Sequence, residues 1–159
     1  MKKFVSIVCL LAFVALMFSG CKSGEYDKGV KLQEEGKYSE AVSVFEGIDD
    51  YQNYKDTADR IEDCNAMIAA IDKYDTSKKS AEQKNTSLDK AVSDADAVIK
   101  KGEKALDDTL YSKLETSVSS TKAAKQNIPE MPSTEEGILS TVNKIDAIDY
   151  TKVLEDLSA

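Results

Sequence analysis

The sequence has no histidine and no tryptophan, and it has only two prolines. Histidine is the commonest general base near neutral pH and a frequent ligand of zinc and iron. Its absence excludes Ser-His-Asp and Cys-His nucleophile activation, and it excludes every metal site that needs an imidazole. Few β-branched and aromatic residues alternate along the chain, which argues against sheet. We therefore expect an all-α protein that is not an enzyme and that uses no metal and no other cofactor.

Acidic residues are missing from the first 20 positions, which have the pattern of a signal peptide. A basic start is followed by an apolar run of 15 residues and then by small residues: Lys2 and Lys3, residues 4–18, and Ser19 with Gly20. A helix that spans a membrane needs about 20 apolar residues, so this run is short for that purpose. An uncleaved membrane anchor is the alternative interpretation.

The residues Phe18-Ser19-Gly20-Cys21 resemble the lipobox of bacterial lipoproteins. In that family a peptidase cleaves just before the cysteine, here between Gly20 and Cys21, and the cysteine sulfur carries a lipid whose acyl chains are typified by palmitate. Two acyl chains give stable anchoring where one would dissociate. The resemblance implies a membrane-anchored protein of the bacterial cell envelope, held by lipid on Cys21 and facing away from the cytoplasm, at the cell surface or in the periplasm.

Cysteine and positive charge are both scarce in the mature part. Cys9 would leave with the leader and Cys21 would carry lipid, so only Cys64 stays a free thiol and no internal disulfide can form. Without a histidine to activate it, we expect Cys64 to be a buried core residue. The mature part carries 19 basic and 29 acidic residues, a net charge of −10. That charge repels phosphate backbones, so we expect no nucleic-acid partner.

A lipidated polar tether, residues 21–25, is expected to lead into two short helices. The first is predicted over residues 26–35 and ends at Gly36, which suits the left-handed position after a helix. The second is predicted over residues 39–46, because apolar residues in it and just after it share one face: Ala41, Val42, Phe45 and Ile48. The two form a tight hairpin with almost no loop.

This hairpin resembles a tetratricopeptide repeat. The resemblance rests on Gly29, on Phe45 and on the run Gly36-Lys37-Tyr38-Ser39-Glu40-Ala41-Val42. It covers roughly residues 25–72, about one and a half repeats, whereas a stable array needs about three. Tetratricopeptide proteins generally bind protein segments. The resemblance therefore implies a protein–protein interaction module whose partner is an envelope protein or peptide.

The tetratricopeptide-like region, residues 26–74, would end with a long third helix that starts at Lys55 or Asp56. Its apolar residues recur every three or four positions, as in amphipathic helices: Ala58, Ile61, Cys64, Ile68 and Ile71. Residues 75–87 carry almost nothing apolar. The sequence leaves two alternatives for them, a polar linker or a solvated extension of the helix.

Residues 88–159 are predicted to form a three-helix bundle with a short tail helix. The apolar stripes cover four ranges: residues 88–99, 106–121, 138–148 and 150–157. Gly102 and Pro129 mark the ends of the first two helices, and Ser133 with Glu136 forms a capping-box start for the third. This half loosely resembles the FIVAR-type three-helix modules of bacterial surface proteins. The predicted fold is thus all-α, a tetratricopeptide-like hairpin plus a long helix, followed by a three-helix bundle.

Aromatic residues gather near the hairpin and form a possible interaction surface: Tyr38, Phe45, Tyr51 and Tyr54. Tyrosine gives contact area at low entropy cost and is enriched in binding sites. The alternative is that these rings pack the turn between helices. An exposed apolar groove near Phe45 and Ile61 would favour an interaction module, and a polar surface would favour a structural role.

Two further functions stay open from the sequence. One is a cell-surface structural lipoprotein, or one that binds glycan or a host component through the C-terminal bundle. The other, a residual alternative, is a cell-wall hydrolase, which needs two carboxylates facing each other across a cleft. The acidic pairs fall at helix starts or loops, where carboxylates favour the positive end of a helix or solvent: Asp49-Asp50, Asp107-Asp108 and Glu135-Glu136.

Overall fold

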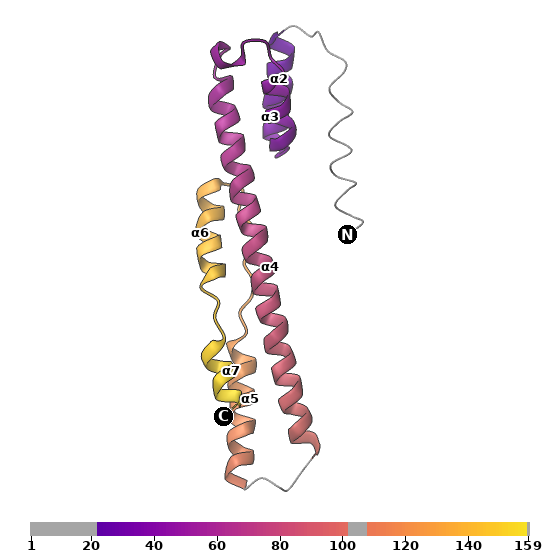
Figure 1. The fold of residues 1–159 in the computed structure, drawn as a ribbon, viewed down its shortest axis with the longest axis vertical. Coiled ribbons are helices and arrows are strands. Elements are labelled where there is room, and N and C mark those ends of the chain that lie inside the picture. The colour runs from indigo at the N-terminus through magenta and orange to yellow at the C-terminus, as the bar shows by residue number, and fades with distance from the viewer. Residues whose placement is uncertain (1–21, 102–107, 159) are drawn as a thin grey trace. The chain divides into compact units, whose positions relative to one another are not determined.

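The structure is a computed structural model that describes residues 22–101 and 108–158. Signal-peptide cleavage and lipidation, predicted at Gly20 and Cys21, lie outside the described residues. Every regular element within them is a helix (Figure 1), which confirms the all-α class. The elements are α2 (Lys22–Glu34), α3 (Tyr38–Glu46), the short 3-10 helix η1 (Tyr51–Asn53), α4 (Thr57–Lys101), α5 (Asp108–Ala124), α6 (Glu135–Asp146) and α7 (Thr151–Ser158).

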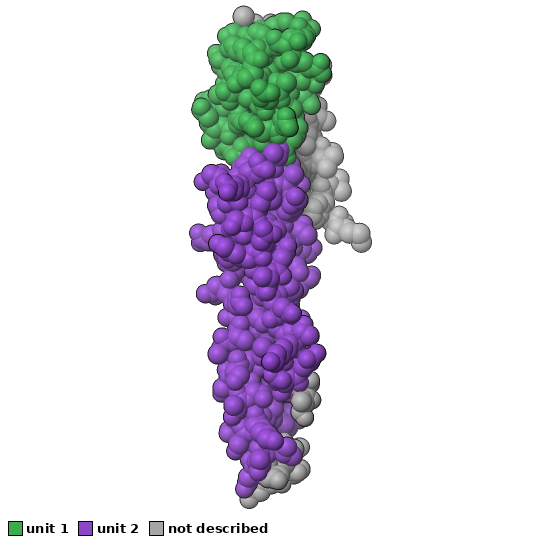
Figure 2. Space-filling model, turned by 90° about the vertical axis from the view of Figure 1, so that its left-hand side faces the viewer, with its two compact units in different colours: residues 1–65 green, residues 66–159 purple. Residues whose placement is uncertain are grey.

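The chain divides into two compact units, residues 1–65 and residues 66–159 (Figure 2). Unit 1 contains α2, α3, η1 and the first residues of α4, and unit 2 contains the rest of α4 with α5, α6 and α7. Each unit has its own cluster of buried apolar residues. No described helix is both long and apolar enough to cross a membrane.

Helix α2 begins at Lys22, so residues 22–25, which we expected to be a tether, lie in its first turn. Its C-terminal end is as the sequence predicts. Gly36 has a φ of +74°, its N–H donates to Gln33 O, and the N–H of Lys37 donates to Leu32 O. These two hydrogen bonds define a Schellman motif, in which a left-handed residue satisfies the last carbonyls of a helix.

Close approach of α2 and α3 depends on Gly29, which is buried in the middle of α2. A Cβ atom placed there would lie 2.6 Å from Cδ1 of Phe45, well inside van der Waals contact. Phe45 is fully buried and packs with Ala41, Ile48 and Cys64, so the ring fills the space that the missing side chain leaves. The predicted hairpin of these two helices is confirmed.

Residues 75–87 are helical and belong to α4, so the linker alternative is wrong. Small side chains in this polar stretch continue a buried stripe at helical spacing. Four buried residues form this stripe: Tyr74, Ser77, Ala81 and Leu88. The last three lie three, seven and fourteen residues after Tyr74. The stripe predicted over residues 88–99 is the last part of the same helix. One helix therefore contributes residues to both units.

The core of unit 2 forms where α6 packs on the stripe of α4. Its buried members from α4 are two alanines, a tyrosine and a leucine, whereas those from α6 and the residues just after it are mostly isoleucine. Ile148 and Tyr150 extend this core between α6 and α7. The buried cluster is Ala70, Tyr74, Ala81, Leu88, Ile138, Val142, Ile145, Ile148 and Tyr150.

The N-terminal cap of α6 lies one residue later than the sequence predicts. Thr134, not Ser133, is the cap, and its Oγ1 accepts a hydrogen bond of 3.2 Å from the N–H of Gly137. Gly137 occupies the third helical position, so the proposed partner Glu136 falls in the wrong place and no capping box forms. The prediction was wrong because serine and threonine stand side by side, and both are good N-caps.

Substitution of Gly29 by alanine tests the close approach of α2 and α3. We expect it to destabilise unit 1 by about 1–3 kcal/mol, because the added methyl group must push the buried ring of Phe45 aside. Gly24→Ala is the matched control in the same helix, since a Cβ there meets nothing within 4 Å. That control should be neutral or stabilising by up to about 1 kcal/mol. Urea unfolding measures both, and equal stabilities for the two variants would contradict the packing.

Candidate functional site

Tyr26 is the centre of a polar and aromatic cluster in unit 1. Its hydroxyl group donates to Asp56 Oδ1 at 2.5 Å and accepts from Arg60 Nε at 3.0 Å. Arg60 Nε also lies 3.0 Å from Asp56 Oδ2, and Arg60 Nη1 donates to Gln33 Oε1 at 2.9 Å. These contacts tie α2 to the start of α4. We call Tyr26, Gln33, Lys55, Asp56 and Arg60 the Tyr26 cluster.

The ring of Tyr26 is enclosed by aromatic and cationic groups. Its centroid lies 6.0 Å from those of Phe45 and Tyr54, the latter edge-on. Lys55 Nζ lies 3.8 Å from the Tyr26 centroid, within cation–π range. Lys55 has a φ of +51°, which non-glycine residues adopt only occasionally. The turn before α4 therefore holds a cation over the ring.

Charges in the Tyr26 cluster shift two pKa values in opposite directions. The hydrogen bond to Asp56 and then burial raise the pKa of Tyr26. The hydrogen bond from Tyr26 lowers the pKa of Asp56, and the bond from Arg60 adds to this effect. Tyr26 therefore stays protonated and Asp56 ionised near neutral pH. The neutral hydroxyl group of Tyr26, hydrogen-bonded to Asp56 and Arg60, therefore joins α2 to the start of α4. In this state it is neither a free base nor a nucleophile.

The aromatic residues predicted to form an interaction surface divide into two groups. Tyr38, Tyr51 and Tyr54 are half-buried against the core of unit 1. Phe45 has no exposed surface at all, so a role in direct partner contact is wrong for this residue. It is buried because it fills the space above Gly29. The three tyrosines therefore fit both alternatives, packing between helices and an interaction surface, since they pack on the core and still expose part of each side chain.

Phe45 and Ile61 do not form an exposed apolar surface, because Phe45 is buried and Ile61 is half-buried against the core of unit 1. Among the described residues, the exposed large hydrophobic side chains are those of Val98, Leu110 and Met131. All three belong to unit 2. The surface of unit 1 therefore offers tyrosine edges and charges to a partner.

Cys64 is a free cysteine and fully buried in the core of unit 1, as the sequence predicts. Burial raises the pKa of its thiol, and the nearby carboxylate of Asp63 adds to the effect. A raised pKa keeps the sulfur protonated, whereas a reactive cysteine needs a lowered one.

The acidic pairs are separated in the fold. Asp49 and Asp50 lie in the turn before η1, and Glu135 and Glu136 form the first turn of α6. Asp107 lies outside the described residues, and Asp108 opens α5. A shallow hollow on α6 is lined by Glu135, Glu136, Leu139, Ser140 and Asn143, with no carboxylate from another element. In the described part of the chain, no group of carboxylates and cysteine could hold a metal ion.

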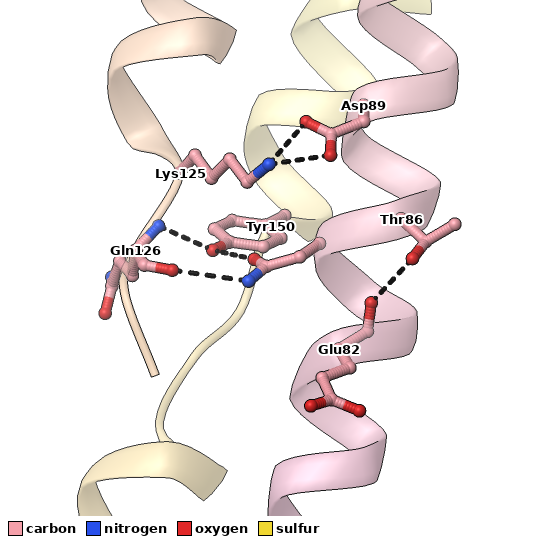
Figure 3. A network of polar contacts seen from close by, with 7 residues as sticks. Glu82, Thr86, Asp89, Lys125, Gln126 and Tyr150 are labelled. Carbon is pink, nitrogen blue, oxygen red and sulfur yellow. Dashed lines mark hydrogen bonds and ion pairs between the residues drawn. The ribbon is translucent and has the colours of Figure 1, made fainter. Parts of the chain in front are cut away.

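A second polar network lies in unit 2 around Tyr150 (Figure 3). The buried Tyr150 hydroxyl group donates to Asn85 Oδ1 at 2.7 Å and accepts from the backbone N–H of Gln126 at 2.8 Å. Asn85 Nδ2 donates in turn to Gln126 O at 3.3 Å. Beside them, Lys125 Nζ lies 2.6 Å from Asp89 Oδ2. The network joins α4 to the residues after α5 and to the start of α7.

From the sequence, Tyr150 is predicted only to begin a short tail helix. The structure starts that helix at Thr151, whose N–H donates to Asp149 Oδ1 at 2.9 Å. No local pattern pairs Tyr150 with Asn85, which is 65 residues away. A buried tyrosine normally needs a partner for its hydroxyl group, but the sequence does not say which residue supplies it.

Comparison with known proteins identifies no relative, since no family model, no curated protein and no solved structure matches this chain. The resemblances to the lipobox, to the tetratricopeptide repeat and to FIVAR-type modules therefore stay predictions.

Tyr150→Phe tests the network in unit 2. We expect it to lower the free energy of unfolding by about 1–3 kcal/mol, because Asn85 and the Gln126 N–H lose a partner in a buried place. Tyr111→Phe is the matched control in the same unit, since its hydroxyl group makes a single bond of 3.2 Å to Ile99 O. The control should cost about 1 kcal/mol or less. If urea unfolding gives both variants the same loss, the network does not stabilise unit 2.

Proposed function

We propose that this chain is a lipid-anchored protein of the bacterial cell envelope whose helical part is a non-catalytic protein-binding module. The observation that carries the proposal is the order of features along the chain. A basic start, an apolar run and Ser19-Gly20 precede Cys21, and α2 begins at Lys22, the next residue. Lipid on Cys21 would hold the protein by two or more acyl chains, enough for stable attachment.

The absence of histidine supports a non-catalytic function, because histidine is the side chain whose unperturbed pKa lies near neutral pH and is the commonest general base. The ionisable groups of the Tyr26 cluster are all engaged with one another, which supports the same view. A module of this kind acts through its surface. The partner would be another protein or a peptide of the envelope, since the net charge of −10 on the predicted mature part opposes nucleic acid.

Protein binding is supported by three tyrosines on the surface of unit 1. Tyr38, Tyr51 and Tyr54 are half-buried, so their rings are fixed by packing before any partner binds. Fixed aromatic side chains lose little entropy on binding, which makes them effective contact residues. Lys55 Nζ lies 5.5 Å from the centroid of the Tyr54 ring and adds positive charge next to it.

A structural lipoprotein, or one that binds glycan or a host component, is the second candidate. The observation that favours it is the burial of Phe45, which removes this aromatic ring from the surface of unit 1. On this alternative, the helical units would hold or space other envelope components instead of binding a protein partner.

Lipid attachment is tested by metabolic labelling of cells with a fatty acid that carries an alkyne. We expect the wild-type chain to take up label and Cys21→Ala to lose it, because the sulfur of Cys21 is the proposed attachment point. The chain offers two matched controls, Cys9→Ser in the leader and Cys64→Ala in the core. Both should keep the label. Label that survives in Cys21→Ala would remove the basis of the anchor.

Protein binding is tested by covalent crosslinking of lysines on intact cells, followed by mass spectrometry of what is recovered with the chain. We expect a small and reproducible set of envelope proteins that is absent from cells lacking the chain. The lysines of both units are available for this, and several are exposed, among them Lys78, Lys79 and Lys113. Recovery of no protein above the control would reject the binding module in favour of the structural alternative.

A further inference from the structure

Residues 125–132, Lys-Gln-Asn-Ile-Pro-Glu-Met-Pro, connect α5 to the cap of α6 and are neither helical nor stranded. We call them the connecting segment. Both prolines of the chain lie in it. Proline fixes its own φ near −65° and restricts the residue before it to extended conformations. Ile128 and Met131 each precede a proline, so the local sequence itself keeps this segment extended.

Side chains from the rest of unit 2 hold the connecting segment in place. At its start, the backbone N–H and C=O of Gln126 bond to Tyr150 and Asn85, as Figure 3 shows. In its middle, Pro129 O accepts from the hydroxyl group of the buried Tyr74 at 2.8 Å. At its end, the Thr134 cap begins α6. The segment is thus ordered before binding, which reduces the entropy that a partner must overcome.

The outer side of the connecting segment is open. Met131 has 44% of its surface exposed, and Asn127 and Glu130 are exposed on either side of Pro129. No backbone–backbone hydrogen bond joins residues 125–132 to any other described residue. An extended backbone with free polar groups and an exposed methionine has the features of a peptide ligand, because methionine adapts to varied apolar pockets.

We propose that residues 127–132 are a pre-ordered linear epitope, bound by a partner protein in an apolar groove for extended, proline-containing peptides, with Met131 as the anchor side chain. This inference rests on the proposed function and names the kind of partner. Prolines at positions 129 and 132 lack the N–H that strand addition needs. Both prolines are half-buried against their own chain, so the partner contacts the exposed side chains of Asn127, Glu130 and Met131.

The negative charges in and beside the epitope predict which charge the rim of the partner's groove carries. Glu130 lies within the epitope, and Glu135 and Glu136 follow it in the first turn of α6. The mature chain as a whole is negative. A groove that binds the epitope would therefore carry lysine or arginine beside the position of Glu130, because opposite charges at the rim speed association and fix register.

The test places a photoreactive benzoylphenylalanine at position 127 of the full chain, expressed in cells that carry its envelope partners. Asn127 is exposed within the epitope, so the anchor Met131 is kept. The matched control places the same group at Leu110, which is 49% exposed in the same unit. We expect an adduct of one defined mass from position 127 and none from position 110. A synthetic peptide of residues 125–134, added in excess to isolated envelopes, should suppress the adduct.

Glu130→Lys, combined with the photoreactive group at 127, should reduce the adduct about tenfold, because it places like charges together. Glu115→Lys on α5 is the exposed control and should leave the adduct unchanged. Circular dichroism checks that both variants melt at the wild-type temperature. An adduct insensitive to the peptide and to Glu130→Lys would overturn the epitope.

Failure of this inference is distinguishable from failure of the proposed function. If lysine crosslinking recovers protein partners but position 127 gives no adduct, the epitope is wrong and the binding module stands. If neither method recovers a protein, both the epitope and the binding module are rejected.

Discussion

The hydroxyl groups of tyrosine residues complete the packing of both units. In unit 2, Tyr150 donates to Asn85 and accepts from the backbone of Gln126, which ties three parts of the chain to one side chain. In unit 1, Tyr26 has the same role between α2 and α4 through Asp56 and Arg60. Small residues such as Ala41, Ala70 and Ala81 lie among the larger apolar residues of the two cores. Directed hydrogen bonds therefore supply specificity that a small apolar core alone would lack.

Local chemistry made part of this fold predictable. Gly36 fixed the end of α2 because a left-handed residue was needed there, and the all-α class followed from periodicity. The helical state of residues 75–87 was not predictable, because the buried residues in that stretch are Ser77 and Ala81, which carry little hydropathy. The burial of Phe45 depends on Gly29, a residue on another helix. Contacts between residues that are distant in the sequence determine these two features, and the local pattern does not predict such contacts.

The candidate site was less predictable than the fold. The three tyrosines named from the sequence do reach the surface of unit 1, but the side chains that organise the polar clusters, Tyr26 and Tyr150, were not identified as such. Each depends on partners at least 24 residues away in the sequence. The sequence predicts the connecting segment only as the end of one helix and the start of the next. Its position depends on the hydrogen bond from Tyr74 to Pro129 O, which no local pattern predicts.

Lipid on Cys21 would give the fold its place in the envelope. Only one peptide bond separates Cys21 from Lys22, the first residue of α2, so the proposed anchor and unit 1 have no spacer between them. A partner would then meet the tyrosines of unit 1 on a protein that diffuses in the plane of a membrane. The proposed anchor and the proposed binding module therefore act together.

The most direct test of this account is mass spectrometry of the N-terminal peptide of the chain extracted from its native membrane. The account predicts a peptide that begins at Cys21 and carries the mass of the acyl chains. A mature protein that retains residues 1–20, or that begins at Cys21 with an unmodified thiol, would contradict it.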